Sequence, residues 1–219
     1  MKINRRQFVR NLGLVTASLS MGSLISTSSC APSGDSRDKR GKVSDDDQFL
    51  FIGDDIAIAQ TEYGKVQGYL LNHVYTFLGV PYGADTSGKN RFMPPQKPEP
   101  WTDVRPAVFY GNTAPQRMEN RWPNNYGTFA DHWNYWDVSE DCLYLNVWTP
   151  GIADGKKRPV LVWLHGGGFT NGSGIEQDGY HGENISREGD IVFCSINHRL
   201  GPIGFSDLSG VGGEAYKDS

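Results

Sequence analysis

The sequence predicts an α/β fold in which antiparallel strands lead into a parallel sheet. Residues 160–164 form a short run of apolar, β-favouring side chains bounded by Pro159 and three glycines. Because every position is apolar, we expect a strand buried on both faces, in a sheet covered by helices. A short helix expected at 182–188 separates it from a second apolar segment at 190–196, which is the strand–helix–strand order of an α/β sheet. Closely spaced β-patterned segments nearer the N-terminus indicate antiparallel hairpins; they are residues 56–61, 64–71 and 74–78.

The first 29 residues have the composition of an export signal. Four basic residues precede a weakly apolar stretch at 12–25, and no acidic residue occurs before position 30. This order is typical of a secretory signal peptide. The segment 4–10 (NRRQFVR) resembles the twin-arginine type of signal, with the pair at Arg5 and Arg6. The alternative, a membrane-spanning anchor, would need about 18–20 apolar residues.

Cys30 follows Thr27, Ser28 and Ser29, an arrangement that resembles a bacterial lipobox, whose cysteine becomes lipidated. An ordinary cleavage site with an incidental cysteine is the alternative. Residues 30–48 are charged and almost devoid of large apolar side chains, so we expect a disordered linker. The protein is therefore expected to be exported, periplasmic or extracellular, either free or tethered to a membrane through Cys30.

The charge balance argues against nucleic acid as a partner. The whole chain has a net charge of −4, and removal of residues 1–29 leaves 17 basic and 25 acidic residues. Binding to phosphates needs clustered lysine and arginine. The histidines at 73, 132, 181 and 198 show no spacing with cysteine or carboxylate that suggests a metal site, and we expect no cofactor.

The middle and end of the chain contain both regular and irregular segments. Residues 94–106 contain five prolines and are expected to be extended. Residues 117–137 hold six aromatic residues among Asn, Gly and Asp, which favours an irregular loop. A further strand is expected at 143–149, whereas 201–219 is rich in Gly and Ser and offers no strand.

Three glycines, residues 166–168, follow the strand at 160–164. Glycines at this place let the backbone turn tightly and leave its N–H groups unshielded. Preorganised N–H donors are what an acyl-transfer enzyme uses to stabilise an oxyanion. The alternative is a glycine-rich turn without chemistry. His165 before the glycines and Phe169 after them match the HGGG-type oxyanion motif of lipases and esterases.

Residues 139–148 (SEDCLYLNVW) resemble the signature of the type B carboxylesterases, the cholinesterase-like branch of the α/β-hydrolases. Three other segments resemble the same family in the same order, and the resemblance extends over roughly residues 57–219; they are 77–82 (FLGVPY), 91–95 (RFMPP) and 197–201 (NHRLG). It implies hydrolysis of a small-molecule ester by a serine, a histidine and an acidic residue. It also implies that Gly167 and Gly168 donate backbone N–H groups to the oxyanion, that His165 supports their loop, and that residues 117–137 lie over the mouth of the active-site gorge. The alternative for those aromatic side chains is packing against their own scaffold.

The sequence departs from the family in what it lacks. No serine stands in a G-x-S-x-G elbow, and the family's elbow and triad follow the 197–201 segment. We therefore expect residues 49–219 to be the N-terminal part of a carboxylesterase domain, truncated before the nucleophile elbow and inactive alone. The alternative is an exported non-catalytic binding module or pseudoenzyme. The sequence does not indicate an oligomeric state.

Two further expectations follow from the resemblance. Ala114 stands where the family often has a cysteine that bridges to the position of Cys142, so no disulfide is expected. Arg91 and Glu140 occupy positions that form an internal ion pair in relatives. Both have large apolar neighbours, so we expect them to be hydrogen-bonded to each other and largely buried. The alternative is that both are solvated.

Overall fold

The computed structural model describes residues 49–117 and 137–219, which lie within one compact unit running from Asp45 to Ser219. The expected signal at 1–29, the linker at 30–48 with Cys30, and nearly all of the aromatic loop lie outside the described residues. Within the described ranges, no helix is long and apolar enough to span a membrane.

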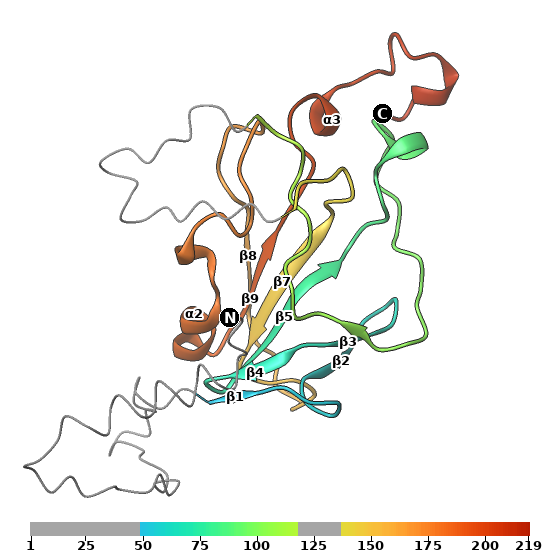
Figure 1. Cartoon of the computed structure of the whole chain (residues 1–219). Coiled ribbons are helices and arrows are strands. Elements are labelled where there is room, and N and C mark those ends of the chain that lie inside the picture. Colours follow the sequence, from blue (N-terminus) through green and yellow to red (C-terminus); the bar gives the residue numbers. More distant parts are fainter. Residues whose placement is uncertain (1–48, 118–136) are drawn as a thin grey trace, which may run out of the picture. The chain divides into compact units, whose positions relative to one another are not determined.

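A six-stranded mixed sheet is the central element (Figure 1). Its strands, in spatial order, are β1 (Leu50–Phe51), β4 (Tyr69–Leu71), β5 (Val74–Pro81), β7 (Tyr144–Thr149), β9 (Val192–Ile196) and β8 (Val160–Trp163). Neighbouring strands are antiparallel from β1 to β9, and β9 and β8 are parallel. The predicted fold class is therefore confirmed: antiparallel strands lead into parallel pairing.

The crossover between β8 and β9 contains the expected helix, α2 (Glu183–Gly189). Glu183 in the first turn and Arg187 in the last turn complement the helix dipole, and they form an i,i+4 ion pair at 3.1 Å. The helix packs on β5, β7 and β9. It is fixed there by Ser186, which is fully buried and whose hydroxyl donates to the Trp148 carbonyl at 3.0 Å.

A second, three-stranded sheet consists of β2 (Ile58–Gln60), β3 (Lys65–Gln67) and β6 (Arg105–Pro106). We expected one strand at 64–71, but the chain divides it between the two sheets at Gly68. A Cβ at this glycine would clash with the Thr76 carbonyl and the Phe77 ring. The close approach of β5 therefore requires glycine where the chain passes from one sheet to the other.

Strand β5 lies between two hydrophobic clusters and is longer than the expected 74–78. Val74 and Leu78 pack with Trp148 and Phe193, whereas Phe77 and Val80 pack with residues of the smaller sheet and its flanking loops. A register irregularity between Phe77 and Val80 places both of these side chains in the same cluster. A third cluster, Ala114, Cys142, Leu143 and Leu200, supports the site described below.

The expectation that residues 160–164 are buried on both faces is wrong. Val160 is 63% exposed and Val162 is 54% exposed. Among the described residues, β8 pairs only with β9 and forms the edge of the sheet. The all-apolar sequence of β8 is that of an interior strand. Among the described residues, the Tyr180 ring of the 178–180 segment packs on Trp163 at 4.9 Å, and the rest of the strand stays largely exposed.

The remaining elements are short. In residues 49–117 and 137–219 they are three 3₁₀ turns, η2 (Gly88–Asn90), η3 (Asp178–Tyr180) and η4 (Glu214–Tyr216), and helix α3 (Gly201–Phe205). Residues 201–219, where we expected no strand, contain α3 and η4 and no strand. Pro202 in the first turn of α3 suits a helix start, because its fixed φ is helical and its missing N–H would be unpaired there.

Candidate active site

The glycine loop that follows β8 has an unusual backbone at three consecutive positions. Gly167, Gly168 and Phe169 have φ angles of +114°, +60° and +60°. A Cβ at Gly167 would clash with the backbone carbonyl of Asn171, whereas nothing lies within 4 Å of a Cβ at Gly166 or Gly168. The loop therefore requires glycine at 167 for space and at 168 for conformation.

His165 orients the first candidate donor. Its ring is buried, and Nδ1 lies 2.8 Å from the Gly166 carbonyl oxygen, a contact that places the proton on Nδ1. In a trans planar peptide the N–H points opposite to the C=O. Holding the Gly166 carbonyl toward the imidazole therefore directs the Gly167 N–H away from it.

The second candidate donor is oriented by the next peptide. The Gly167 carbonyl accepts hydrogen bonds from the N–H of Thr170 (3.1 Å), the N–H of Asn171 (3.2 Å) and the Thr170 hydroxyl (3.0 Å). The Gly168 N–H consequently points to the side opposite Thr170 and Asn171. In the part of the chain that the structure describes, neither the Gly167 nor the Gly168 N–H has a hydrogen-bond acceptor. Both donors are thus oriented and available to a ligand oxygen.

Three polar residues that the sequence analysis did not assign connect this loop to the scaffold. The Gln116 side chain exchanges two hydrogen bonds with the backbone of Gly172, at 2.9 and 2.8 Å. Asn197, buried at the end of β9, accepts from the Gly174 N–H at 2.7 Å and donates to the Asn112 carbonyl at 3.0 Å. Asn197 stands in the 197–201 motif and directly after an apolar strand, but neither observation indicates these contacts.

His198 is the third of these residues. Its imidazole stacks on that of His165, with centroids 4.5 Å apart and planes 5° apart. In the sequence, His198 belongs to the 197–201 motif and shows no spacing that suggests a metal site, and neither observation predicts this stacking. Within the two described ranges, no group of three His, Cys, Asp or Glu side chains is arranged to hold a metal ion.

Arg91 and Glu140 lie beside the segment that leads into β7. Arg91 Nε donates to both carboxylate oxygens at 3.0 and 2.8 Å, and Nη2 donates to Oε1 at 2.6 Å. The guanidinium hydrogen bonds raise the pKa of Arg91. The expectation that both side chains are largely buried is wrong for Arg91, which is 46% exposed, while Glu140 is 17% exposed. The scaffold covers the carboxylate and leaves one side of the arginine in water.

Two of the three cysteines are described, and both are buried free thiols. Burial raises the pKa of Cys142 to about 12 and that of Cys194 to about 11. Both groups are therefore neutral near pH 7 and unsuited to act as nucleophiles.

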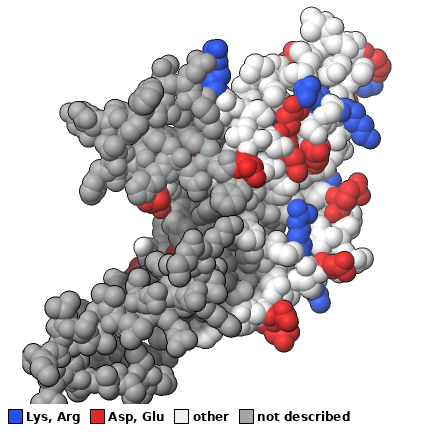
Figure 2. All heavy atoms as spheres, in the orientation of Figure 1, with Lys and Arg blue, Asp and Glu red and all other residues white. Residues whose placement is uncertain are grey.

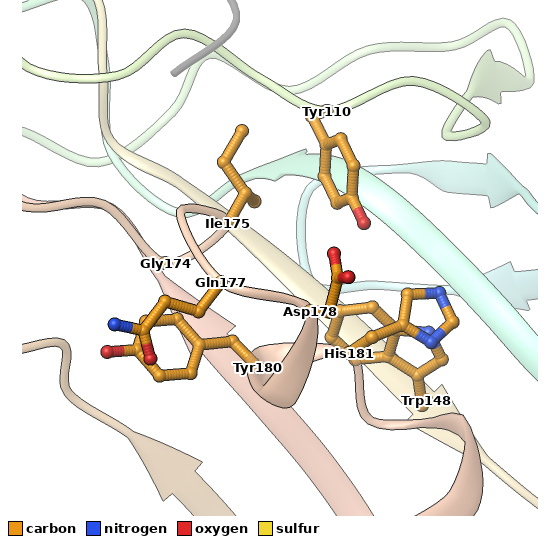
Figure 3. Close-up of a pocket in the computed structure, with 8 residues that line it drawn as sticks. All are labelled: Tyr110, Trp148, Gly174, Ile175, Gln177, Asp178, Tyr180 and His181. Atoms are coloured by element: carbon orange, nitrogen blue, oxygen red, sulfur yellow. The ribbon is translucent and has the colours of Figure 1, made fainter. Parts of the chain in front are cut away.

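A separate pocket of about 310 Å³ lies between Tyr110 and the segment after the glycine loop (Figure 3). Trp148 lies at its base, and the hydroxyl of Tyr110 and the carboxylate of Asp178 point toward each other across it. Burial, with smaller effects from Tyr69 and Asp178, raises the pKa of Tyr110 to about 12, and burial lowers the pKa of His181. This pocket could not be predicted from the sequence, because its lining comes from separate segments.

The described surface carries charges of both signs. On the face shown in Figure 2, acidic and basic side chains are interspersed, and the basic ones form no continuous patch there. Among the described residues of that face, lysine and arginine are therefore not clustered as binding to phosphates needs.

Comparison with known proteins identifies the family. Residues 55–213 match the carboxylesterase family. Phenmedipham hydrolase from Pseudarthrobacter oxydans is 45% identical over 157 residues, which cover 72% of this chain and 30% of that protein. Para-nitrobenzyl esterase from Bacillus subtilis is 39% identical over 165 residues, 74% of this chain and 31% of that protein. The chain belongs to the carboxylesterase family, as its motifs predicted.

Solved structures agree with this assignment. An esterase from Clostridium hathewayi, described as hydrolysing aliphatic aromatic polyesters, has a TM-score of 0.68 and 37% identity, covering 78% of this chain and 33% of that one. A Geobacillus stearothermophilus carboxylesterase has a TM-score of 0.61 and 38% identity over 73% of this chain and 30% of its own. The 219 residues span about a third of the length of these relatives.

Proposed function

We propose that these residues supply the oxyanion-binding part of a carboxylic-ester hydrolase that acts on small-molecule esters. The observation that carries the proposal is the pair of glycine N–H groups at 167 and 168, each oriented by its neighbouring carbonyl and neither hydrogen-bonded within the described residues. Such donors stabilise the charge that develops on the carbonyl oxygen in the tetrahedral transition state. Membership of the carboxylesterase family supports the assignment.

These 219 residues would supply the oxyanion donors, and residues outside them would supply the catalytic triad. In this type of hydrolysis a serine attacks the ester carbonyl, a histidine accepts its proton, and an acidic residue orients the histidine. The 219 residues contain no G-x-S-x-G elbow. We therefore propose that the nucleophile, acid and base are supplied by sequence that is not among them, and that His165 acts on the loop and not on the substrate.

The test compares two proteins. One is the 219-residue chain, and the other is the product of the complete reading frame that contains it. Both are assayed with p-nitrophenyl acetate, with and without a serine-directed organophosphate. We expect no hydrolysis above background from the first and inhibitable hydrolysis from the second. An inactive complete protein would favour a non-catalytic binding role, and robust activity of the short chain would contradict the division of labour.

We also propose that the protein is exported through the twin-arginine route. The pair Arg5–Arg6 within the sequence NRRQFVR supports this proposal. Replacing both arginines by lysine should leave precursor in the cytoplasm, as measured by cell fractionation. A parallel Cys30→Ser variant tests lipidation: loss of labelled fatty acid from the protein is expected if Cys30 is the lipidated residue. Unaffected export of the double-lysine variant would refute the route.

A further inference from the structure

Phe169, unlike the glycines before it, has a side chain that disfavours its positive φ angle. Its φ of +60° lies in the left-handed region, where a bulky residue is uncommon and the backbone is strained. Phe169 is 66% exposed, so burial offsets little of this strain. The conformation must therefore be stabilised by specific contacts, and it is coupled to the donors because Phe169 directly follows Gly168.

The contacts come from one segment, residues 198–205. The Gly201 N–H donates to the Phe169 carbonyl at 2.7 Å. The Phe205 ring packs against the Phe169 ring, with centroids 4.9 Å apart. The imidazole of His198 stacks on that of His165 at the other end of the same turn. Contacts from this segment thus reach both ends of the glycine turn, at residues 165 and 169.

The segment itself is anchored in the core. Leu200 is almost fully buried in the cluster with Cys142 and Leu143. Asn197, which precedes it, is buried and its N–H donates to the Tyr144 carbonyl at 2.8 Å. His198 and Phe205 also contact each other edge to face, with centroids 6.1 Å apart. Because Leu200 and Asn197 are buried and the two rings pack on each other, the segment can hold the glycine loop in one position.

We propose that residues 198–205 form a clamp that fixes the direction of the Gly167 and Gly168 N–H groups, with His198 as a positioning residue that acts through His165. The inference rests on the proposed role of the two glycines in binding an oxyanion. The stacking contact holds the His165 ring, the ring holds the Gly166 carbonyl through Nδ1, and that carbonyl determines the direction of the Gly167 N–H. Because the role of His198 is stacking, another flat ring should replace it.

The test uses the full 219-residue chain labelled with ¹⁵N-glycine, and it needs no ester substrate. Amide order parameters of Gly167 and Gly168 are measured in the parent, in His198→Ala and in His198→Phe. We expect rigid values of about 0.85 in the parent, values below about 0.6 in His198→Ala, and near-parent values in His198→Phe. Phe109→Ala, which truncates an exposed side chain elsewhere, is the matched control and should leave the order parameters of both glycines unchanged.

The other outcomes contradict the clamp. Lower thermal stability in His198→Ala with unchanged glycine order parameters would mean that His198 only stabilises the fold. Failure of His198→Phe to restore the order parameters would exclude stacking as its role. If His198→Ala does not fold, Phe205→Ala replaces it, because that ring is 55% exposed and its loss should spare the core. Unchanged order parameters of Gly167 and Gly168 in a folded Phe205→Ala protein would likewise overturn the clamp, whatever the esterase assay shows.

Discussion

Arg91 and Glu140, 49 residues apart in the sequence, are joined by three hydrogen bonds of 2.6–3.0 Å. The two partners differ in exposure, because the carboxylate is mostly covered and the guanidinium is half in water. The Glu140 backbone carbonyl also accepts a hydrogen bond from the hydroxyl of buried Thr86. The pair therefore connects the 85–91 loop to the segment that enters the central strand β7.

The first prediction concerns this pair. Arg91→Ala should lower the urea midpoint of unfolding, and Arg91→Lys should recover only part of the loss, since an ammonium group cannot reproduce the planar two-nitrogen contact. Because Arg91 is half exposed, the loss should shrink at high salt. Lys97→Ala is the control: its partner Glu62 is 3.5 Å away and both side chains are exposed, so no measurable change is expected. Equal effects of Lys97→Ala and Arg91→Ala would contradict the prediction.

A second prediction distinguishes two of the three glycines of the loop, Gly167 and Gly166. In the product of the complete reading frame, Gly167→Ala should lower kcat about 10²–10³-fold, the effect of losing one oxyanion donor. The reason is the clash of its Cβ with the Asn171 carbonyl, at a φ of +114°. Gly166→Ala is the matched control, since its Cβ meets no atom within 4 Å and its φ is not positive. Steady-state kinetics with p-nitrophenyl acetate measure both, and comparable losses in the two variants would show that the geometry of 167 is not decisive.

The elements that a local residue pattern marks could be predicted from the sequence, whereas features that depend on distant segments could not. Strands β7 and β9 and helix α2 agree with their expected ranges within two residues, because apolar runs and turn residues mark them. The exposure of β8 could not be predicted, since an all-apolar strand does not reveal whether an element covers it. Nor could the division at Gly68, which depends on the approach of Thr76 and Phe77 from another strand.

The site divides in the same way. Gly167, Gly168 and His165 could be proposed from the sequence because they stand in one run of consecutive residues. Gln116 and Asn197 were missed because their roles depend on contacts with the backbone at 172 and 174, across 56 and 23 residues. Long-range hydrogen bonds of single polar side chains leave no periodic pattern in a sequence.

The third prediction tests the anchoring of helix α2. Ser186→Ala removes a buried hydroxyl that donates to the Trp148 carbonyl, so it should lower the free energy of unfolding by about 1 kcal/mol. Ile185→Ala on the same helix is the control. That side chain is exposed, so its change should remain within about 0.5 kcal/mol. Urea unfolding followed by fluorescence measures both, and a Ser186→Ala protein as stable as the parent would show that the hydroxyl does not anchor the helix.

The last prediction concerns alkaline pH. Burial raises the pKa of Cys142 from 9.0 to about 12, and burial with the nearby Asp141 raises that of Tyr144 from 10.0 to about 12. Between pH 9 and 12 the unfolded chain therefore releases protons that the folded chain retains. The free energy of unfolding should consequently fall as pH rises through this window, by up to about 1.4 kcal/mol per pH unit for the Cys142 thiol and by less for Tyr144, whose interactions are partly screened by water.

The measurement is a series of urea titrations from pH 8 to pH 11 in a Cys30→Ser background. Cys142→Ala should be less stable at pH 8 because it leaves a small cavity, yet its stability should depend less steeply on pH, because one of the retained protons is gone. Iodoacetamide at pH 8 provides an independent check. Cys142 and Cys194 should remain unmodified in the folded chain and react once urea unfolds it, since only the thiolate is nucleophilic. Rapid alkylation of Cys142 without urea, or an unchanged pH slope in Cys142→Ala, would show that burial does not hold this thiol in its neutral form.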